Sequence, residues 1–162
     1  MSHPLDAIEF RRADGSTTSL AEWAGKAVLV VNVASRCGLT PQYEALESLQ
    51  QRYAARGFTV LGFPSNQFLQ ELSSNDKIAQ YCSSTWGISF PILDRVRVNG
   101  RRAAPLFRAL EATPVLDGKA GRVTWNFEKF LVSPDRHVQR FRPHMVPDDP
   151  AIIAAIEACL PG

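Results

Sequence analysis

The sequence predicts an α/β fold in which a mixed central β-sheet carries helices on both faces. A β-branched run, Ala27–Val33, is typical of a buried strand. An amphipathic segment over Pro41–Arg56 and a second apolar run, Phe58–Phe63, follow it. Because a strand, a crossover helix and a strand form a βαβ unit, these two strands should be parallel. Near the C-terminus, Trp125–Val132 and His137–Phe141 flank a Ser-Pro-Asp turn signal and predict an antiparallel pair.

The helix after the first strand is predicted by its ends and by its apolar spacing. Thr40 and Pro41 are typical of an N-cap and a first helical residue, and Gly57 is placed to end the helix. Apolar and aromatic residues recur every three or four positions, as one buried face requires. That face is expected to contain Tyr43, Leu46, Leu49 and Tyr53.

The remaining elements are shorter. Asp14-Gly15 predicts a hairpin turn, and one helical turn is expected over Leu20–Trp23. Helices are expected over Ser74–Cys82 and over Pro105–Ala112, the latter with proline in its first turn. A last helix should begin with Asp149 as cap and Pro150 as first residue, followed by an apolar stripe of Ile152, Ile153, Ile156 and Leu160.

This order of elements is that of a thioredoxin-like fold, and the 162 residues suit a single domain over 1–162. The net charge of +2 gives no argument for binding nucleic acid or an acidic membrane surface. No apolar stretch is long enough to span a bilayer, and Met1–Asp6 lacks the basic and apolar parts of a secretion signal. We therefore expect a cytoplasmic protein with no membrane span.

Cysteine and histidine usage narrows the chemistry further. Three cysteines in a chain of this length do not form a disulfide framework, which fits a reducing compartment. The histidines at 3, 137 and 144 are scattered, so they are expected at the surface and no metal site is predicted.

Cys37 is the candidate nucleophile, because it follows the first strand and precedes the first helix. Backbone N–H groups at a helix N-terminus stabilise a thiolate over a thiol, and Arg36 adds a neighbouring positive charge. The alternative is a small buried hydrophobic residue. In the segment Cys37–Thr40, threonine takes the place of the second cysteine of a C-x-x-C motif, which excludes dithiol exchange within the motif. A lone thiolate can attack a disulfide or an electrophilic oxygen.

Three motifs decide between these reactions, because they resemble those of the glutathione peroxidase family in its cysteine-containing form. They occur in that family's order and at about its spacing, and the resemblance extends from about Phe10 to Leu160. Three motifs together are far more specific than one. The motifs are Asn32–Thr40 around the cysteine, Gly62–Phe68, and Trp125–Val132.

The resemblance implies a catalytic group of Cys37, Gln70, Trp125 and Asn126. In this chemistry a thiolate attacks one peroxide oxygen, and an amide NH₂ and an indole N–H stabilise the thiolate and the developing negative charge. Trp125 taken alone could instead be a core aromatic residue. Asn126 lies within a predicted strand, where asparagine is unfavourable, which indicates a role beyond packing.

The catalytic glutamine has two candidates. Compared with the family pattern, the loop before Gln70-Glu71 is one residue short, because only Leu69 separates that pair from Phe68. Gln67 is the reserve candidate, with bracing of the loop as its structural alternative.

The resemblance also implies a route for resetting the oxidised cysteine. Peroxide converts Cys37 to a sulfenic acid, which condenses with a thiol. Cys82 is the expected resolving residue, after partial unwinding of its helix; an inert buried cysteine is the alternative. Many relatives carry another cysteine at the place of Ser65, and Cys159 is expected to pack under the last helix.

The chain is therefore predicted to be a thiol peroxidase that reduces hydrogen peroxide and organic hydroperoxides. No bound cofactor is expected; thioredoxin is the expected reducing co-substrate, with glutathione as the alternative. A third hypothesis is a peroxide-sensing redox-relay protein that uses the same thiol. The interval between Thr113 and Thr124 lacks the insertion of tetrameric relatives, so the resemblance implies a monomer.

Overall fold

The centre of the molecule is a mixed four-stranded sheet in the order β4-β3-β5-β6. The computed structural model describes residues 3–114, 118 and 120–162. β3 (Ala27–Val33) pairs in parallel with β4 (Phe58–Pro64) and antiparallel with β5 (Lys129–Val132). β6 (Val138–Phe141) pairs antiparallel with β5 at the edge. The predicted α/β class and mixed sheet are confirmed.

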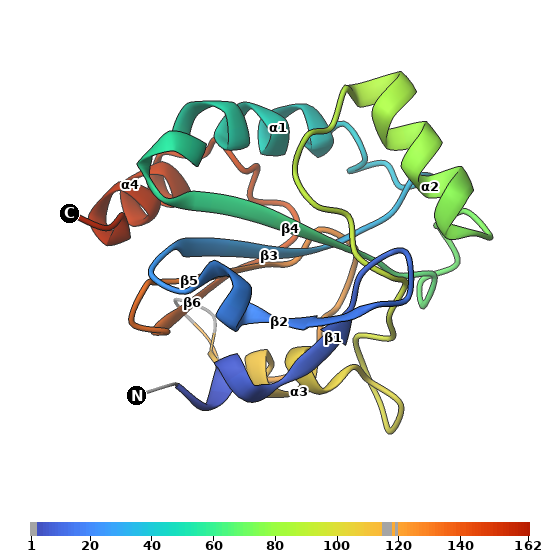
Figure 1. The fold of residues 1–162 in the computed structure, drawn as a ribbon. Helices are drawn as coiled ribbons and strands as arrows, with labels where there is room; N and C mark the ends of the chain where they lie inside the picture. Colours follow the sequence, from blue (N-terminus) through green and yellow to red (C-terminus); the bar gives the residue numbers. More distant parts are fainter. Residues whose placement is uncertain (1–2, 115–117, 119) are drawn as a thin grey trace.

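Helices cover both faces of this sheet (Figure 1). α1 (Gln42–Tyr53) and α4 (Pro150–Cys159) lie on one face, and α2 (Asn75–Tyr81) lies beyond the end of α1. α3 (Pro105–Leu110) lies on the other face, beside a hairpin of β1 (Glu9–Arg11) and β2 (Thr17–Ser19). Single 3₁₀ turns span Pro4–Ala7, Leu20–Trp23 and Ala54–Arg56.

Two hydrophobic clusters explain why β3 is buried along its whole length and almost entirely apolar. Leu29 and Val31 belong to the cluster that contains Leu46 of α1, whereas Val28 and Val30 belong to the cluster that contains Phe107 of α3. Because successive strand residues point to opposite faces, a strand covered on both sides needs apolar residues throughout. Cys37, in the turn that follows β3, belongs to the same cluster as Leu46.

The first helix begins later than its sequence predicts. Pro41 is its N-cap and makes no side-chain capping bond, and the helical hydrogen-bonding pattern begins at Gln42. Thr40 does not cap α1, because its hydroxyl is bonded within the turn around Cys37. At the other end, Gly57 adopts φ +86 after the 3₁₀ turn, so the predicted stop is confirmed.

The third motif begins as a turn, although a strand was expected over Trp125–Val132. β5 starts only at Lys129, and Phe127 has a left-handed φ of 68°. Trp125 and Asn126 therefore lie in the turn that leads into β5. The prediction that Asn126 lies within a strand was wrong, and a tight turn is a natural place for asparagine.

The segment that carries Cys82 continues past the predicted helix end. α2 is capped by Ser74, whose hydroxyl accepts from the Lys77 N–H, and it passes into a π-helical turn over Cys82–Trp86. Within the described residues, no helix is long and apolar enough to cross a membrane. Part of the Thr113–Thr124 interval, residues 115–117 and 119, lies outside the described residues, as does the start of the Met1–Asp6 segment.

Candidate active site

Cys37 lies in a compact turn between β3 and α1, and 7% of its surface is exposed. Its sulfur accepts two hydrogen bonds, from the Leu39 backbone N–H at 3.3 Å and from the Trp125 indole Nε1–H at 3.2 Å. The Cys37 backbone N–H donates to Thr40 Oγ1 at 2.9 Å. The sequence predicted backbone donors at a helix N-terminus, but α1 begins only at Gln42. The backbone N–H that donates to the sulfur is instead that of Leu39, in the turn itself. The Arg36 side chain is exposed to solvent.

The turn that carries Trp125 is fastened to β3 by Asn32, which sequence reasoning did not single out. Asn32 Nδ2 donates to the Trp125 carbonyl at 3.1 Å, and its Oδ1 accepts from the Glu128 N–H at 3.0 Å. The Asn32 carbonyl accepts from the Phe127 N–H at 2.6 Å. A polar residue near the end of an otherwise apolar, buried strand is the signal that could have identified Asn32.

Gln70 is brought to the same place by the loop after β4. Its Oε1 accepts from Asn126 Nδ2 at 3.0 Å, and its carbonyl accepts from the Arg36 N–H at 2.8 Å. The Phe68 ring packs against Trp125 with 5.2 Å between ring centroids. Asn126 is fully buried, and its hydrogen bond leads to Gln70 rather than to the sulfur. The four residues therefore form one connected group in which Trp125 contacts the sulfur directly.

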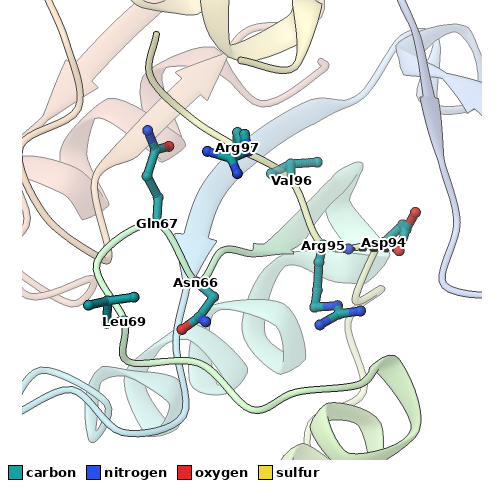
Figure 2. A pocket seen from close by; sticks show the side chains of 7 residues that line it. All are labelled: Asn66, Gln67, Leu69, Asp94, Arg95, Val96 and Arg97. Carbon is teal, nitrogen blue, oxygen red and sulfur yellow. Dashed lines mark hydrogen bonds between the residues drawn. The ribbon is translucent and has the colours of Figure 1, made fainter. Parts of the chain in front are cut away.

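Gln67 points elsewhere and braces the loop. Its Oε1 accepts from the Val98 and Asn99 N–H groups at 2.7 and 2.9 Å, and its Nε2 donates to the Asn99 carbonyl at 3.1 Å. These bonds match the structural alternative considered for Gln67. The same loop lines one side of a cleft of about 580 Å³. Figure 2 shows Arg95 and Arg97 on the segment opposite Gln67 and Leu69.

A second, smaller cleft of about 290 Å³ adjoins the Cys37 turn itself. Gly38 and Leu39 form one side of it, and Val146 and Pro147 form the other. Val146 is one of the large hydrophobic residues exposed to solvent. An apolar cleft of this kind can accommodate the hydrocarbon part of an organic molecule.

Cys82 is a free thiol buried to 2% exposure at the junction of α2 and the π-helical turn. Burial raises the pKa of Cys82 to about 11; the Tyr43 hydroxyl opposes this effect and the Glu71 carboxylate adds to it. The Tyr43 hydroxyl lies beside the thiol, but it makes no hydrogen bond of normal geometry. Cys82 is therefore held as a neutral thiol in this arrangement. Cys159, the last residue of α4, is partly buried against the same cluster.

The Glu71 carboxylate lies close to Ser35, which precedes the Cys37 turn, and to Cys82. Its Oε1 accepts from the Ser35 and Leu72 N–H groups at 3.1 and 2.8 Å, and burial raises the pKa of Glu71. The Glu71 side chain thus ties the loop of Gln70 to the strand end that precedes Cys37.

A lone cysteine that follows a parallel strand in a thioredoxin-like fold, with an indole N–H donated to its sulfur, is an arrangement that suits a thiol nucleophile. The structure of a thioredoxin-family thiol:disulfide interchange protein from Chlorobium tepidum has a TM-score of 0.68 at 21% identity, covering 98% of each chain. That likeness supports the fold. The crystal structure of T. cruzi GPX1 has a TM-score of 0.74 at 33% identity, covering 96% of this chain and 95% of that one.

Sequence comparisons identify the family. The glutathione peroxidase family model matches residues 5–111. A thioredoxin/glutathione peroxidase of Escherichia coli is 45% identical over 91% of this chain and 92% of its own length. A hydroperoxy fatty acid reductase of Synechocystis is 45% identical over 91% and 90%. The chain belongs to the glutathione peroxidase family, and it is a thiol peroxidase.

Proposed function

We propose that Cys37 is the residue that attacks hydrogen peroxide and organic hydroperoxides, with Gln70, Trp125 and Asn126 as neutral hydrogen-bonding groups. The observation that carries this proposal is the 3.2 Å hydrogen bond from the Trp125 indole to Cys37 Sγ. Two N–H groups, of Leu39 and of the Trp125 indole, donate to this sulfur, and hydrogen bonds to an ionised acceptor are stronger than those to a neutral one.

In the proposed reaction, the Cys37 thiolate gives an electron pair to one peroxide oxygen and the O–O bond breaks. The other oxygen leaves as hydroxide or alkoxide and takes a proton to become water or an alcohol. Sulfur is oxidised to a sulfenic acid while the peroxide is reduced. Because the Gln70 Oε1 is engaged by Asn126, its NH₂ is the end that remains to donate to the developing charge.

Organic hydroperoxides are included as substrates because an apolar cleft adjoins the Cys37 turn. The Synechocystis relative, named a hydroperoxy fatty acid reductase, supports the same class of substrate. We propose that the hydrocarbon part lies over Leu39 and Val146 while the peroxide group meets the sulfur.

Cys82 is the proposed resolving residue. Its thiol attacks the sulfenic sulfur of Cys37, which forms a disulfide and releases water. The π-helical turn that begins at Cys82 supports this role, because such turns are frequent at functional sites and their bonding is less regular than that of an α-helix. Disulfide formation requires the two Cα atoms to come within about 7 Å, so this segment would have to open first.

Thioredoxin is the proposed reductant of the disulfide, and glutathione is the alternative that would attack the sulfenic acid directly. The name of the E. coli relative joins both reductants, so both belong in the test. We further propose that the protein works as one domain over residues 1–162, as a monomer in the reducing cytoplasm, which its three free cysteines support.

Replacing Cys37 tests the nucleophile. In a Cys37→Ser variant, peroxide consumption with either reductant should fall to the background rate, because a hydroxyl is a far weaker nucleophile at neutral pH. Stopped-flow measurement of peroxide loss checks this, with Cys159→Ser as the matched control that keeps its activity. Undiminished consumption by Cys37→Ser would refute the proposal.

Replacing Cys82 tests the resolving step. The Cys82→Ser variant should complete one fast turnover and then stop cycling with thioredoxin, because no disulfide forms. Mass mapping after one equivalent of peroxide should show a Cys37–Cys82 disulfide in the unmodified protein and a sulfenic acid at Cys37 in the variant. Normal thioredoxin-driven cycling without Cys82 would assign the reaction to the direct thiol route.

A further inference from the structure

Lys129 is a buried lysine that the proposed reaction does not use. Its side chain has no exposed surface, although it begins a strand at the centre of the sheet. Nζ donates to the Phe127 carbonyl at 2.7 Å and to the Pro143 carbonyl at 3.0 Å. Burying an amine that can carry charge is costly, so the position needs an explanation beyond packing.

The two carbonyls that Lys129 binds belong to two different segments, the turn that carries Trp125 and the segment at Pro143. Phe127, with its left-handed φ of 68°, directly follows Trp125 and Asn126. The Pro143 carbonyl also accepts from Gln42 Nε2 at 2.8 Å, which joins it to the start of α1. Lys129 therefore links the turn that carries the indole to the segment that holds the first residue of α1.

Asn32 and Lys129 bind different backbone groups of the turn that carries Trp125. Asn32 binds the Trp125 carbonyl and the N–H groups of Phe127 and Glu128, but it does not bind the Phe127 carbonyl. Lys129 supplies the partner for that remaining group. A non-glycine residue with a left-handed φ is strained, and this conformation persists only where its surroundings hold it.

An ion pair with the neighbouring Glu128 does not explain why Lys129 is buried at this position. The neighbouring Glu128 carboxylate is bound by Arg140 and by Arg142, the latter at 3.2 Å. Burial, opposed by Glu128, lowers the pKa of Lys129 to about 7. Since a neutral amine also donates hydrogen bonds, the link to the two carbonyls does not depend on the charge.

We propose that Lys129 is a positioning residue for the peroxidase reaction: by holding the Phe127 carbonyl against the Pro143 segment, it aims the Trp125 indole N–H at Cys37 Sγ. The catalytic effect rests on the role proposed for Trp125 above. The link itself stands on the geometry of Lys129, whatever the role of the indole.

The test compares Lys129→Met, which keeps the length of the side chain and removes the donor, with Lys129→Gln, which keeps a donor. Lys26→Met, at an exposed lysine, is the matched control. Two quantities are measured: the rate constant for oxidation by hydrogen peroxide in a single turnover, and the ¹⁵N–¹H signal of the Trp125 indole, assigned with Trp125→Phe. The indole signals of Trp23 and Trp86 report whether each variant is folded.

Lys129→Met should be oxidised about tenfold more slowly or worse, the scale expected for a weakened hydrogen bond to a charged group. Its Trp125 signal should move towards the position that it has in Cys37→Ala, while the Trp23 signal stays unchanged. The oxidation rate and the Trp125 signal of Lys129→Gln should lie between those of Lys129→Met and those of the unmodified protein. Both quantities should be normal in Lys26→Met. If Lys129→Met does not fold, Lys129→Gln carries the comparison.

A Trp125 signal and an oxidation rate that stay unchanged in folded Lys129→Met, or in Lys129→Gln where only that variant folds, with only the melting temperature altered, would overturn the proposal. If Trp125→Phe is oxidised at the normal rate, the role proposed for the indole fails instead. In that case the indole signal still decides whether Lys129 positions it.

Discussion

Thr40 shows how one buried hydroxyl shapes the turn around the candidate nucleophile. Its Oγ1 accepts from the Cys37 N–H and donates to the Ala34 carbonyl, both at 2.9 Å. The Thr-Pro pair predicted that Thr40 caps the helix, and that prediction was wrong, because its hydroxyl is bonded within the turn around Cys37. The partner of the hydroxyl depends on the path of the turn, which the local sequence pattern does not give.

Thr40→Val should therefore destabilise the protein and slow its oxidation by peroxide. Valine keeps the shape but leaves the Cys37 N–H and the Ala34 carbonyl buried without partners, which costs about 1–3 kcal/mol per group. Urea unfolding measures the loss of stability. Thr40→Ser, which keeps the hydroxyl, should lose much less, and equal losses in both variants would contradict this account.

Among single residues, Cys37 and the Trp125-Asn126 pair stand in recognisable motifs, whereas Gln70 follows the second motif in a loop that departs from the family pattern. The structure joins Cys37 to Trp125 and Gln70 to Asn126 by hydrogen bonds, and their catalytic roles stay a prediction. Asn32 escaped notice because a strand propensity says nothing about a side chain that binds a distant turn. The choice between the two glutamines could not be settled from sequence, since it depends on the fold of a loop one residue shorter than the family pattern.

At the scale of elements, cap residues gave a correct prediction at α4 and a wrong one at α1. Asp149 caps α4 as predicted, accepting from the Ala151 N–H at 2.8 Å. The strand expected from Trp125 was four residues too long, because aromatic and β-branched residues favour a strand while tertiary hydrogen bonds from Asn32 impose a turn. Apolar patterning alone cannot represent that competition.

The π-helical turn leads to a prediction about Cys82. Because burial raises its pKa to about 11, Cys82 in the reduced native protein should react very slowly with iodoacetamide at pH 8. Its reactivity should rise as the pH approaches 11 and whenever the segment opens. Mass spectrometry of alkylated peptides measures this, with the protein unfolded in urea as the reference. Equal alkylation of native and unfolded protein at pH 8 would show that the thiol is not held as described.

For the molecule as a whole, the sheet register assembles the site from distant segments. Val33 pairs with Pro64 in β4, so the loop that carries Gln70 leaves the sheet beside the end of β3. Val31 pairs with Lys129 in β5, which places the turn of Trp125 and Asn126 at the same edge. The parallel pairing of β3 and β4 was predictable from the βαβ order; the placement of β5 beside β3 requires the tertiary structure.

The most direct test of the account is the single-turnover rate of oxidation by hydrogen peroxide in Trp125→Phe, with Trp23→Phe from the opposite cluster as control. Losing a hydrogen bond to a charged sulfur should slow the variant about 10- to 150-fold, since such bonds contribute about 1.5–3 kcal/mol and each 1.4 kcal/mol is tenfold in rate. Trp23→Phe should retain the normal rate. A Trp125→Phe variant that is oxidised as fast as the unmodified protein would contradict the central claim that the indole N–H supports the reactive sulfur.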